Sequence, residues 1–192
     1  MLDDGLVIDV TRMKGIFVEP AARTATAQTG LTWGEFDRET HVHGLATTGG
    51  LVSTTGIAGL TLGGGVGWLM GRCGLVCDNT LNYDVVLASG EMARANTSEN
   101  ADLFWALKGG GGNFGVVTRF TFGAQEFGPM MRVGVSLYEP GDAAAALREY
   151  AAIVPTLPRS VGWHAALKHD IPALPFVPQE LVGRRLLMFI SM

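Results

Sequence analysis

The chain reads TTGGLVSTTGIAGLTLGGGVG from residue 47 to residue 67. Glycine leaves backbone N–H groups without a neighbouring Cβ, and successive amides in a turn form a concave site for an anion. The hydroxyl groups of residues 53–55 add donors, and a helix that starts near Gly56 would point its positive end toward the same anion. The stretch therefore predicts a backbone cradle for a diphosphate.

Close packing of two structural elements explains the same glycines equally well. The interleaved Val52, Ile57 and Leu60 argue only against a solvated linker, which would lack large apolar residues. Two phosphate-binding fingerprints are absent: no Gly-Lys-Ser/Thr ends the tract, and no clear strand feeds a G-x-G-x-x-G followed by an acidic residue. The sequence disfavours a P-loop NTPase and a Rossmann dehydrogenase, and it leaves ligand contact and tight packing open.

The same region is long enough to be mistaken for a membrane span, because no charged residue occurs from Gly44 to Gly71. Ten of these 28 residues are glycine and six are serine or threonine, so the Leu, Ile and Phe content that favours insertion is missing. The N-terminus, Met-Leu-Asp-Asp-Gly, is acidic and reaches no apolar signal core. We expect no membrane span and no secretion signal.

Composition narrows the class of protein further. The 192 residues carry a net charge of −4 with a pI near 5.5, which leaves no basic surface for a nucleic acid. Hydrophobic residues make up 47% and charged residues 17%, which excludes intrinsic disorder. The two cysteines, Cys73 and Cys77, are too few for a disulfide scaffold or a structural zinc site, and their C-x₃-C spacing favours ordinary thiols. We expect a cytoplasmic protein without a metal site.

Periodicity predicts short strands and helices in the first two thirds of the chain. Thr32 and Glu35 have the spacing of a capping box, which predicts a helix from about Trp33 to His43. Ser98, followed by acidic residues, predicts the cap of a second helix that ends at Gly109. The expected strands cover residues 6–10, 15–19, 23–29, 80–89, 92–96 and 114–122.

The pattern changes after Gly123. Residues 124–129 read as a connector, followed by a strand (131–137), an Ala-rich helix (142–154), a second strand (161–168) and a final apolar run (185–192). No turn or polar tail follows this run, so we expect the chain to end inside an element and its sheet edges to favour self-association. The predicted fold class is α+β, with antiparallel sheets.

Several ordered motifs resemble one family of flavoproteins. They are Val7-Ile8-Asp9, Arg12-Met13-Lys14-Gly15-Ile16, Thr32-Trp33-Gly34-Glu35, residues 56–65, Gly74-Leu75 with Asp78-Asn79, residues 102–107, and residues 112–118. In this order they resemble FAD-linked oxidases of the p-cresol methylhydroxylase (PCMH) and vanillyl-alcohol oxidase (VAO) fold, in the berberine-bridge-enzyme-like branch. The resemblance runs from about residue 6 to residue 123.

The resemblance implies a PCMH-type FAD-binding lobe, an antiparallel sheet flanked by helices, in residues 1–123. Residues 124–192 would begin a substrate-binding domain and contain an incomplete antiparallel sheet. FAD is the implied cofactor, with its diphosphate and isoalloxazine edge along residues 50–67 and its adenosine end at residues 112–117. The implied cofactor-binding residues are Gly50, Ser53, Thr54, Thr55, Gly56, Gly59, Leu60, Gly63, Gly64, Gly67, Gly112, Gly115 and Val117.

The chain departs from the family pattern at both ends. The Arg-Gly-Gly-Gly-His-type loop that often bonds the flavin covalently is missing, and Val52 stands where many members have a flavin-linked cysteine. Any FAD is therefore expected to be bound non-covalently. The strands that bring the catalytic base are also missing, so the catalytic residues stay unknown. Arg72 is expected to pair with Asp78 or with the ligand, and Asp78-Asn79 to shape a turn.

Two functions follow from these observations. One is an FAD-dependent oxidoreductase, or a fragment of one, that transfers hydride from an alcohol, sugar or amine-like carbon to FAD, with reoxidation by oxygen. Its partners would be a small-molecule substrate and oxygen. The other is an inactive truncated flavoprotein fragment that binds FAD weakly or not at all.

Overall fold

The computed structural model describes residues 5–128, 130–139, 141, 143–175 and 177–192. The chain forms two compact units, residues 1–129 and residues 130–192. Both combine helices with antiparallel sheets, so the predicted α+β class is confirmed.

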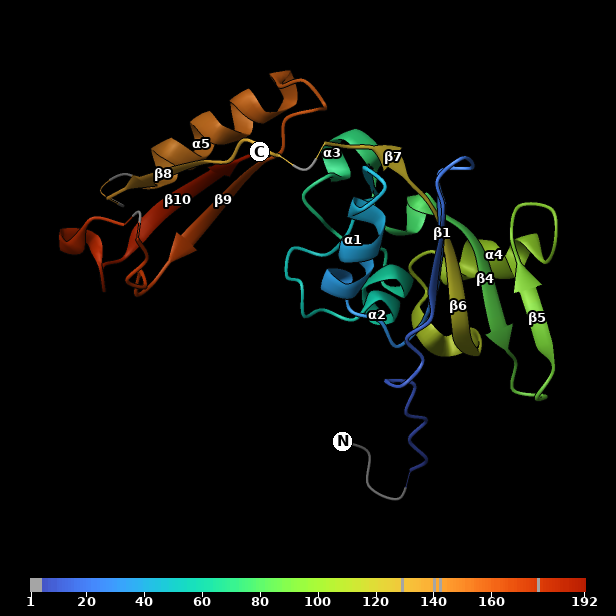
Figure 1. Cartoon of the computed structure of the whole chain (residues 1–192). Coiled ribbons are helices and arrows are strands. Elements are labelled where there is room, and N and C mark those ends of the chain that lie inside the picture. The colour runs from blue at the N-terminus through green and yellow to red at the C-terminus, as the bar shows by residue number, and fades with distance from the viewer. Residues whose placement is uncertain (1–4, 129, 140, 142, 176) are drawn as a thin grey trace. The chain divides into compact units, whose positions relative to one another are not determined.

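The first unit is built on a five-stranded antiparallel sheet with the strand order β1-β2-β6-β4-β5 (Figure 1). The strands are β1 (Ile16–Glu19), β2 (Thr24–Gln28), β4 (Thr80–Val86), β5 (Met92–Ala95) and β6 (Val116–Gly123). Strand β6 lies at the centre of the sheet, although it comes last in the sequence, and it joins the hairpin β1-β2 to the hairpin β4-β5.

The two faces of this sheet differ because residues alternate along each strand. On one face, Ala25, Tyr83 and Phe120 come from three neighbouring strands and are fully buried. On the other face, their neighbours in sequence, such as Thr26 and Asp84, are polar and only partly buried. The first face is covered by helices, and the second is an open polar surface.

Several short helices accompany the sheet of the first unit. They are α1 (Trp33–His41), α2 (Ile57–Leu62), α3 (Met70–Cys73), η1 (Cys77–Asn79), α4 (Ala101–Leu107) and η2 (Gly111–Phe114). The predicted capping box of α1 is confirmed. The Thr32 side chain accepts a hydrogen bond from the Glu35 amide, and the Glu35 carboxylate accepts one from the Thr32 amide.

Aromatic rings connect the helices to the covered face of the sheet. Trp33 and Phe36 of α1 both pack on Phe122 of β6, with ring centroids 5.7 and 5.3 Å away. Phe122 stacks on Phe120, which contacts Tyr83. Such ring pairs add to the free energy of burial when centroids lie about 4.5–7 Å apart. This chain of rings fixes α1 relative to strands β4 and β6.

A small second sheet explains where the first unit ends. Strand β3 (Leu45–Ala46) pairs with β7 (Gln125–Glu126), and the Phe127 amide donates to the Gly44 carbonyl. Residues 124–127 therefore belong with the first unit, whereas the sequence placed the boundary after residue 123. The assignment of residues 124–192 to a substrate-binding domain stays a prediction.

The second unit contains a three-stranded antiparallel sheet with the order β8-β10-β9. Its elements are β8 (Gly134–Tyr138), α5 (Ala143–Ile153), η3 (Val154–Thr156), β9 (Trp163–Lys168), η4 (Gln179–Leu181) and β10 (Leu186–Ser191). Tyr150 of α5 packs on Trp163 and Phe189 of the sheet. Each predicted strand and helix of this unit is found with slightly different ends, and residue 142, the predicted helix start, lies outside the described residues.

Two local predictions were wrong. Residues 6–10 form no strand, and Leu6 and Val7 are 90% and 86% exposed, because no described strand offers them hydrogen bonds. Ser98 does not cap α4, since its amide and hydroxyl both donate to the Asn96 carboxamide oxygen. The N-cap is Asn100, whose backbone is left-handed and which makes no side-chain capping bond.

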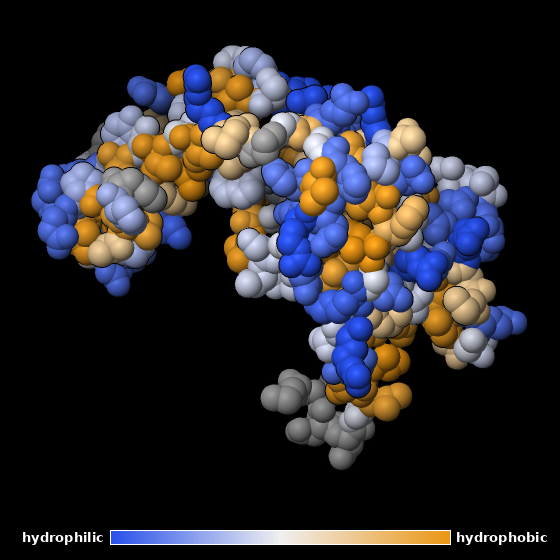
Figure 2. Space-filling view, viewed as in Figure 1, coloured by the Kyte–Doolittle hydropathy of each residue, from blue (hydrophilic) through white to orange (hydrophobic). Residues whose placement is uncertain are grey.

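Apolar side chains also reach the surface of both units (Figure 2). In the second unit these include Tyr138, Ile153 and Leu167, which are 55%, 42% and 53% exposed. No helix in the described part of the chain has the length and apolar content needed to cross a bilayer.

We predict that Glu35→Gln destabilises the fold at neutral pH. Hydrogen bonds from Lys14 and from the Thr32 amide, 2.6 and 2.8 Å long, lower the pKa of Glu35 to about 2. A carboxyl group with a lowered folded-state pKa stabilises the fold above its unfolded value and loses that contribution as the pH falls through the folded value. The free-energy difference between wild type and variant, measured by urea unfolding, should be constant above pH 4.5 and shrink toward pH 2.

The matched control is Glu39→Gln, because the carboxylate of Glu39 pairs only with the adjacent Arg38 among the described residues. An equal loss of stability in both variants would contradict the role of the capping box.

Candidate functional site

An open groove of about 540 Å³ lies beside α2 in the first unit. Its walls are formed by the loop before α2, by α2 itself and by the glycine run after it. The lining residues are Gly50, Leu51, Val52, Thr55, Gly59, Leu60, Gly63, Gly65 and Val66. Five of them were predicted as cofactor-binding residues: Gly50, Thr55, Gly59, Leu60 and Gly63.

Backbone hydrogen bonds hold the wall of the groove against the start of α1. The amides of Gly34 and Trp33 donate to the carbonyls of Ser53 and Thr55, and the Ile57 amide donates to the Leu31 carbonyl. These bonds are 2.8–2.9 Å long. The loop that precedes α2 is therefore fixed by main-chain contacts that do not depend on its own side chains.

Several amides before and after α2 form no hydrogen bond with a described residue. Within the described part of the chain, no acceptor pairs with the N–H groups of residues 50–54 or 65–67. Gly56, the N-cap of α2, likewise donates to no described carbonyl or side chain. Residues 51–54, 56 and 66 are exposed, so water can satisfy their amides. Gly50 is half-buried and Gly65 and Gly67 are buried, and amides at such positions normally find an acceptor, so these three are the candidates for contact with a ligand.

The glycines of the tract serve two different purposes. A Cβ on Gly67 would lie 1.7 Å from the Gly49 carbonyl oxygen, and one on Gly65 would lie 2.5 Å from Val76. A Cβ on Gly56, Gly59 or Gly64 would meet no protein atom within 4 Å. Close packing, one of the two explanations left open by the sequence, is therefore confirmed for Gly65 and Gly67. Gly59 leaves space beside the groove, and its contact with a ligand stays a prediction.

The floor beneath Gly49 and Gly50 is the indole of Trp33. A Cβ on Gly50 would lie 2.9 Å from Trp33 Cδ1, so the backbone rests directly on the ring. Trp33 is fully buried, and its Nε1–H has no hydrogen-bond acceptor within the described residues. The hydroxyl of Thr47, at the start of the same loop, is also buried without a described partner.

The turn beyond the groove has the role that the sequence predicted. The Asp78 carboxylate accepts from the Leu75 amide, and the Asn79 side chain donates to the carbonyls of Cys73 and Leu75. Of the two expectations for Arg72, the ion pair with Asp78 is not found among the described residues. Its guanidinium lies 4.8 Å from the centre of the Phe127 ring, in a cation–π contact. The other expectation, a pair with the ligand, stays a prediction.

The second glycine tract lies next to the first, because η2 contacts α2. A Cβ on Gly112 would meet no protein atom within 4 Å, whereas one on Gly115 would lie 2.6 Å from the Val86 carbonyl oxygen. Val117 is 4% exposed and packs in the core, so only its backbone is available to a ligand. Ser53, Thr54, Gly56, Gly64 and Gly67 belong to the tract without lining the groove.

Electrostatically the groove is neutral, since none of its lining residues carries a charge. Asp37 of α1 lies behind Gly49, its Oδ1 3.6 Å from the position of a Cβ there. Solvent reaches this side chain, yet desolvation by the surrounding protein raises the pKa of Asp37 to about 6.

Burial also raises the pKa of both cysteine thiols, which are free, as expected for ordinary thiols.

Leu51, Val52, Gly65 and Val66 line the groove but were not predicted to do so. They lie inside the quoted tract, and only the fold shows which of its residues face the groove. In the described residues, no cluster of three or more His, Cys, Asp or Glu side chains forms a metal site.

Residues 1–96 match the protein family described as FAD binding domain. The chain belongs to this family. Free amides, an open glycine helix face and the orphaned Trp33 Nε1–H fit an extended anionic dinucleotide, and FAD is the cofactor of the family. The predicted cofactor is thus confirmed, while the contacts of individual residues with FAD stay predictions.

Similar proteins place this FAD-binding domain among oxidoreductases. The FAD-linked oxidoreductase pgmH of Aspergillus terreus is 47% identical over 126 residues, which cover 66% of this chain and 26% of that protein. The chain spans about a quarter of the length of such curated relatives. The protein is accordingly a member of the FAD-dependent oxidoreductase family.

Two solved structures show the same fold over nearly the whole chain. 6-Hydroxy-D-nicotine oxidase from Arthrobacter nicotinovorans matches with a TM-score of 0.82 and 26% identity, covering 99% of this chain and 40% of that one. BBE-like protein 28 from Arabidopsis thaliana matches with a TM-score of 0.83 and 26% identity, covering 96% and 36%. The predicted PCMH/VAO-type fold and its berberine-bridge-enzyme-like branch are confirmed.

We predict that Gly59→Leu removes flavin binding without loss of folding. The new side chain meets no protein atom at its Cβ and stands in the groove, and a helical glycine costs about 1 kcal/mol relative to residues with a side chain. The variant should melt at or above the wild-type temperature in circular dichroism and bind FAD at least about tenfold more weakly by fluorescence titration. Gly128→Leu, a second glycine with open space around it, is the matched control and should bind FAD as wild type does. If Gly59→Leu binds FAD with wild-type affinity, the cofactor binds at a site other than this groove.

We predict the opposite behaviour for Gly67→Ala. Its Cβ would overlap the Gly49 carbonyl oxygen, a backbone atom that cannot turn aside, so the variant should lose about 3–5 kcal/mol of unfolding free energy. Gly56→Ala, which adds the same methyl group to open space, should lose less than about 1 kcal/mol. Urea unfolding of both variants measures the difference, and equal stabilities would refute the close contact.

Proposed function

We propose that the first unit holds the diphosphate and the adjoining flavin edge of FAD in an oxidoreductase that oxidises a small molecule with an alcohol, sugar or amine-like carbon. The observation that carries this proposal is the neutral, glycine-lined groove beside α2, next to which the half-buried or buried amides of Gly50, Gly65 and Gly67 have no described acceptor. Bound FAD would supply a two-electron acceptor for hydride from the substrate, with oxygen as the final acceptor.

The residues of the groove are suited to binding rather than to proton transfer. Amides of residues 50–54 and 65–67 would donate to phosphate oxygens, and the N-terminus of α2 would add its positive end. Leu51, Val52 and Val66 give the groove apolar walls, which suit the edge of a planar ring system and exclude water from it. No lining side chain has a titratable group, so the catalytic base is to be sought outside the groove.

The alternative is that this chain alone binds FAD weakly and has no activity. Leu6 and Val7 are almost fully exposed to solvent, and Tyr138, Ile153 and Leu167 of the second unit are about half exposed. Such surfaces favour association through sheet edges, which we propose for the isolated chain in place of a stable monomer. The free cysteines are consistent with the proposed cytoplasmic location.

Absorbance of the purified chain distinguishes the two functions. A yellow protein with the visible bands of oxidised flavin, retained after gel filtration with added FAD, would support the first. A colourless protein that stays colourless after incubation with FAD, while circular dichroism shows it to be folded, would favour the inactive fragment. Release of the flavin on denaturation would confirm that attachment is non-covalent.

We predict that the FAD affinity of this site depends only weakly on salt. Amide dipoles and the helix end hold the anion at short range, and the groove contains no lysine or arginine whose attraction is screened. The dissociation constant should change by less than about threefold between low and physiological ionic strength, because screening acts mainly on exposed charge pairs. A steep salt dependence, measured by fluorescence titration, would instead indicate that side-chain cations such as Lys108 bind the diphosphate.

A further inference from the structure

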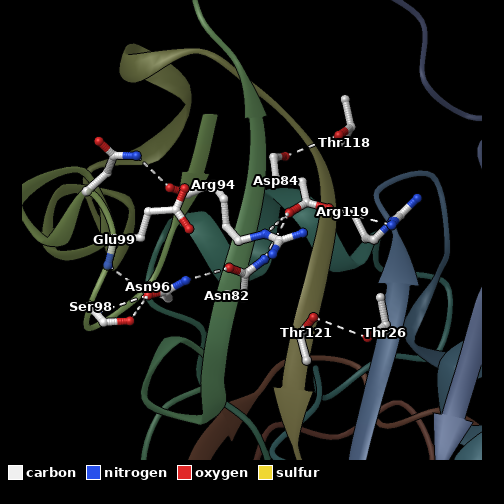
Figure 3. Close-up of polar contacts among 11 residues, drawn as sticks. Thr26, Asn82, Asp84, Arg94, Asn96, Ser98, Glu99, Thr118, Arg119 and Thr121 are labelled. Carbon is white, nitrogen blue, oxygen red and sulfur yellow. Dashed lines mark hydrogen bonds and ion pairs between the residues drawn. The ribbon is translucent and has the colours of Figure 1, made fainter. Parts of the chain in front are cut away.

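The open face of the five-stranded sheet carries a row of charged residues away from the groove. Arg119 of β6 pairs in register with Asp84 of β4, which pairs with Arg94 of β5. These side chains gather on the same face (Figure 3). Trp33, Phe36 and α2 pack on the other face, so this row is separated from the groove by the sheet itself.

The two guanidinium groups share one carboxylate but form no close hydrogen bond with it. Arg94 Nε lies 3.5 Å from Asp84 Oδ1, and Arg119 Nη1 lies 3.6 Å from Asp84 Oδ2. Asp84 Oδ1 instead accepts a hydrogen bond from the Asn82 side chain at 3.0 Å. The other ion pairs between described residues are direct, for example Lys14 with Glu35 at 2.6 Å. Arg94 and Arg119 therefore keep their N–H donors available.

The fixed charge at this place is positive in an otherwise acidic chain. The Asp84 side chain is only 16% exposed, whereas those of Arg94 and Arg119 are 62% and 51% exposed. One carboxylate thus holds two arginines beside each other without neutralising both, against a net charge of −4 for the chain. Arginine presents a planar fork of donors that suits carboxylate and phosphate groups.

Two shallow hollows meet at Arg119. One, of about 390 Å³, is bounded by the charged row together with the hydroxyls of Thr26 and Thr121. The other, of about 400 Å³, shares Thr26 and Arg119 and extends over Phe17. Phe17 pairs in register with Thr26 and is 66% exposed, so an aromatic ring borders the charged row on the same face.

We propose that this face is a binding site for a small organic oxoanion, with its carboxylate or phosphate group between Arg94 and Arg119 and its apolar body over Phe17. Asp84 would position the two guanidinium groups and would also weaken the site by its own charge. The alternative is that the ion pairs of Arg94, Asp84 and Arg119 only stabilise the pairing of the strands. In that case this face would not bind small anions.

The experiment titrates the 192-residue chain with phenyl phosphate, benzoate and benzyl alcohol while its amide resonances are followed by NMR. The two anions should shift resonances of β4, β5 and β6 in a saturable manner, and the neutral alcohol should not. The tighter of the two anions identifies phosphate or carboxylate as the preferred group. Inorganic phosphate tests the charged part of the site without the ring.

Variants separate the parts of the proposed site. Arg94→Gln and Arg119→Gln should each weaken binding of phenyl phosphate by about tenfold, the effect of one lost charge-assisted contact. Asp84→Asn should tighten it, because a competing negative charge is removed while a hydrogen-bonding oxygen remains. Phe17→Ala should weaken phenyl phosphate and leave inorganic phosphate unchanged. Arg38→Gln, an exposed arginine paired with Glu39, is the matched control.

Absence of saturable shifts on this face in the folded protein would overturn the proposal. Equal binding of benzyl alcohol, or weaker anion binding by Asp84→Asn with its fold intact, would do the same. Gly59→Leu should bind phenyl phosphate as wild type does, which makes this result independent of the FAD groove.

Discussion

The approach of Gly67 to the carbonyl oxygen of Gly49 is the contact on which the groove depends. The positions before and after α2 lie so close there that a Cβ would overlap a backbone atom at 1.7 Å. Because of this contact, the uncharged stretch from Gly49 to Gly67 folds back on itself, and α2 lies between its two ends. Gly50 and Gly65 then line the same groove, although they are more than ten residues apart in sequence.

This arrangement needs a rigid support, which α1 supplies. The capping box sets the first turn of α1, and the amides of Trp33 and Gly34 in that turn hold the loop at residues 53–55. Trp33 itself lies under Gly49 and Gly50 and packs through Phe122 onto the central strand. A loop held in this way would need little reorganisation when the proposed anion binds, because the cost of ordering it is met on folding.

Features with a local cause could be predicted from the sequence, and features that depend on a partner could not. The cap of α1, the start of α2 near Gly56 and the turn at Asp78-Asn79 each depend on residues a few positions apart, and all were predicted. Residues 6–10 have strand-like side chains but no described strand to pair with. The Ser98 hydroxyl donates to the Asn96 side chain instead of capping α4. Arg72 contacts the ring of Phe127, which is more than fifty residues away in sequence, and no rule of local spacing predicts such a contact. The resemblance supplied the cofactor, which the glycines alone left undecided.

The two anion sites proposed for the first unit differ in kind, and their difference follows from their surroundings. In the groove, close main-chain packing excludes long side chains, so only amides and the end of a short helix are available, and apolar residues fill the remaining wall. On the open sheet face, alternation places long polar side chains toward solvent, where two guanidinium groups are held by the mostly buried Asp84. Neutral amide dipoles act at short range and favour a ligand that is enclosed, whereas exposed arginines act over several ångströms and favour one that exchanges with solvent. The two proposals therefore place a tightly held cofactor on the covered side of the sheet and a weakly held ligand on its open side, where the charges of one site would not disturb the other.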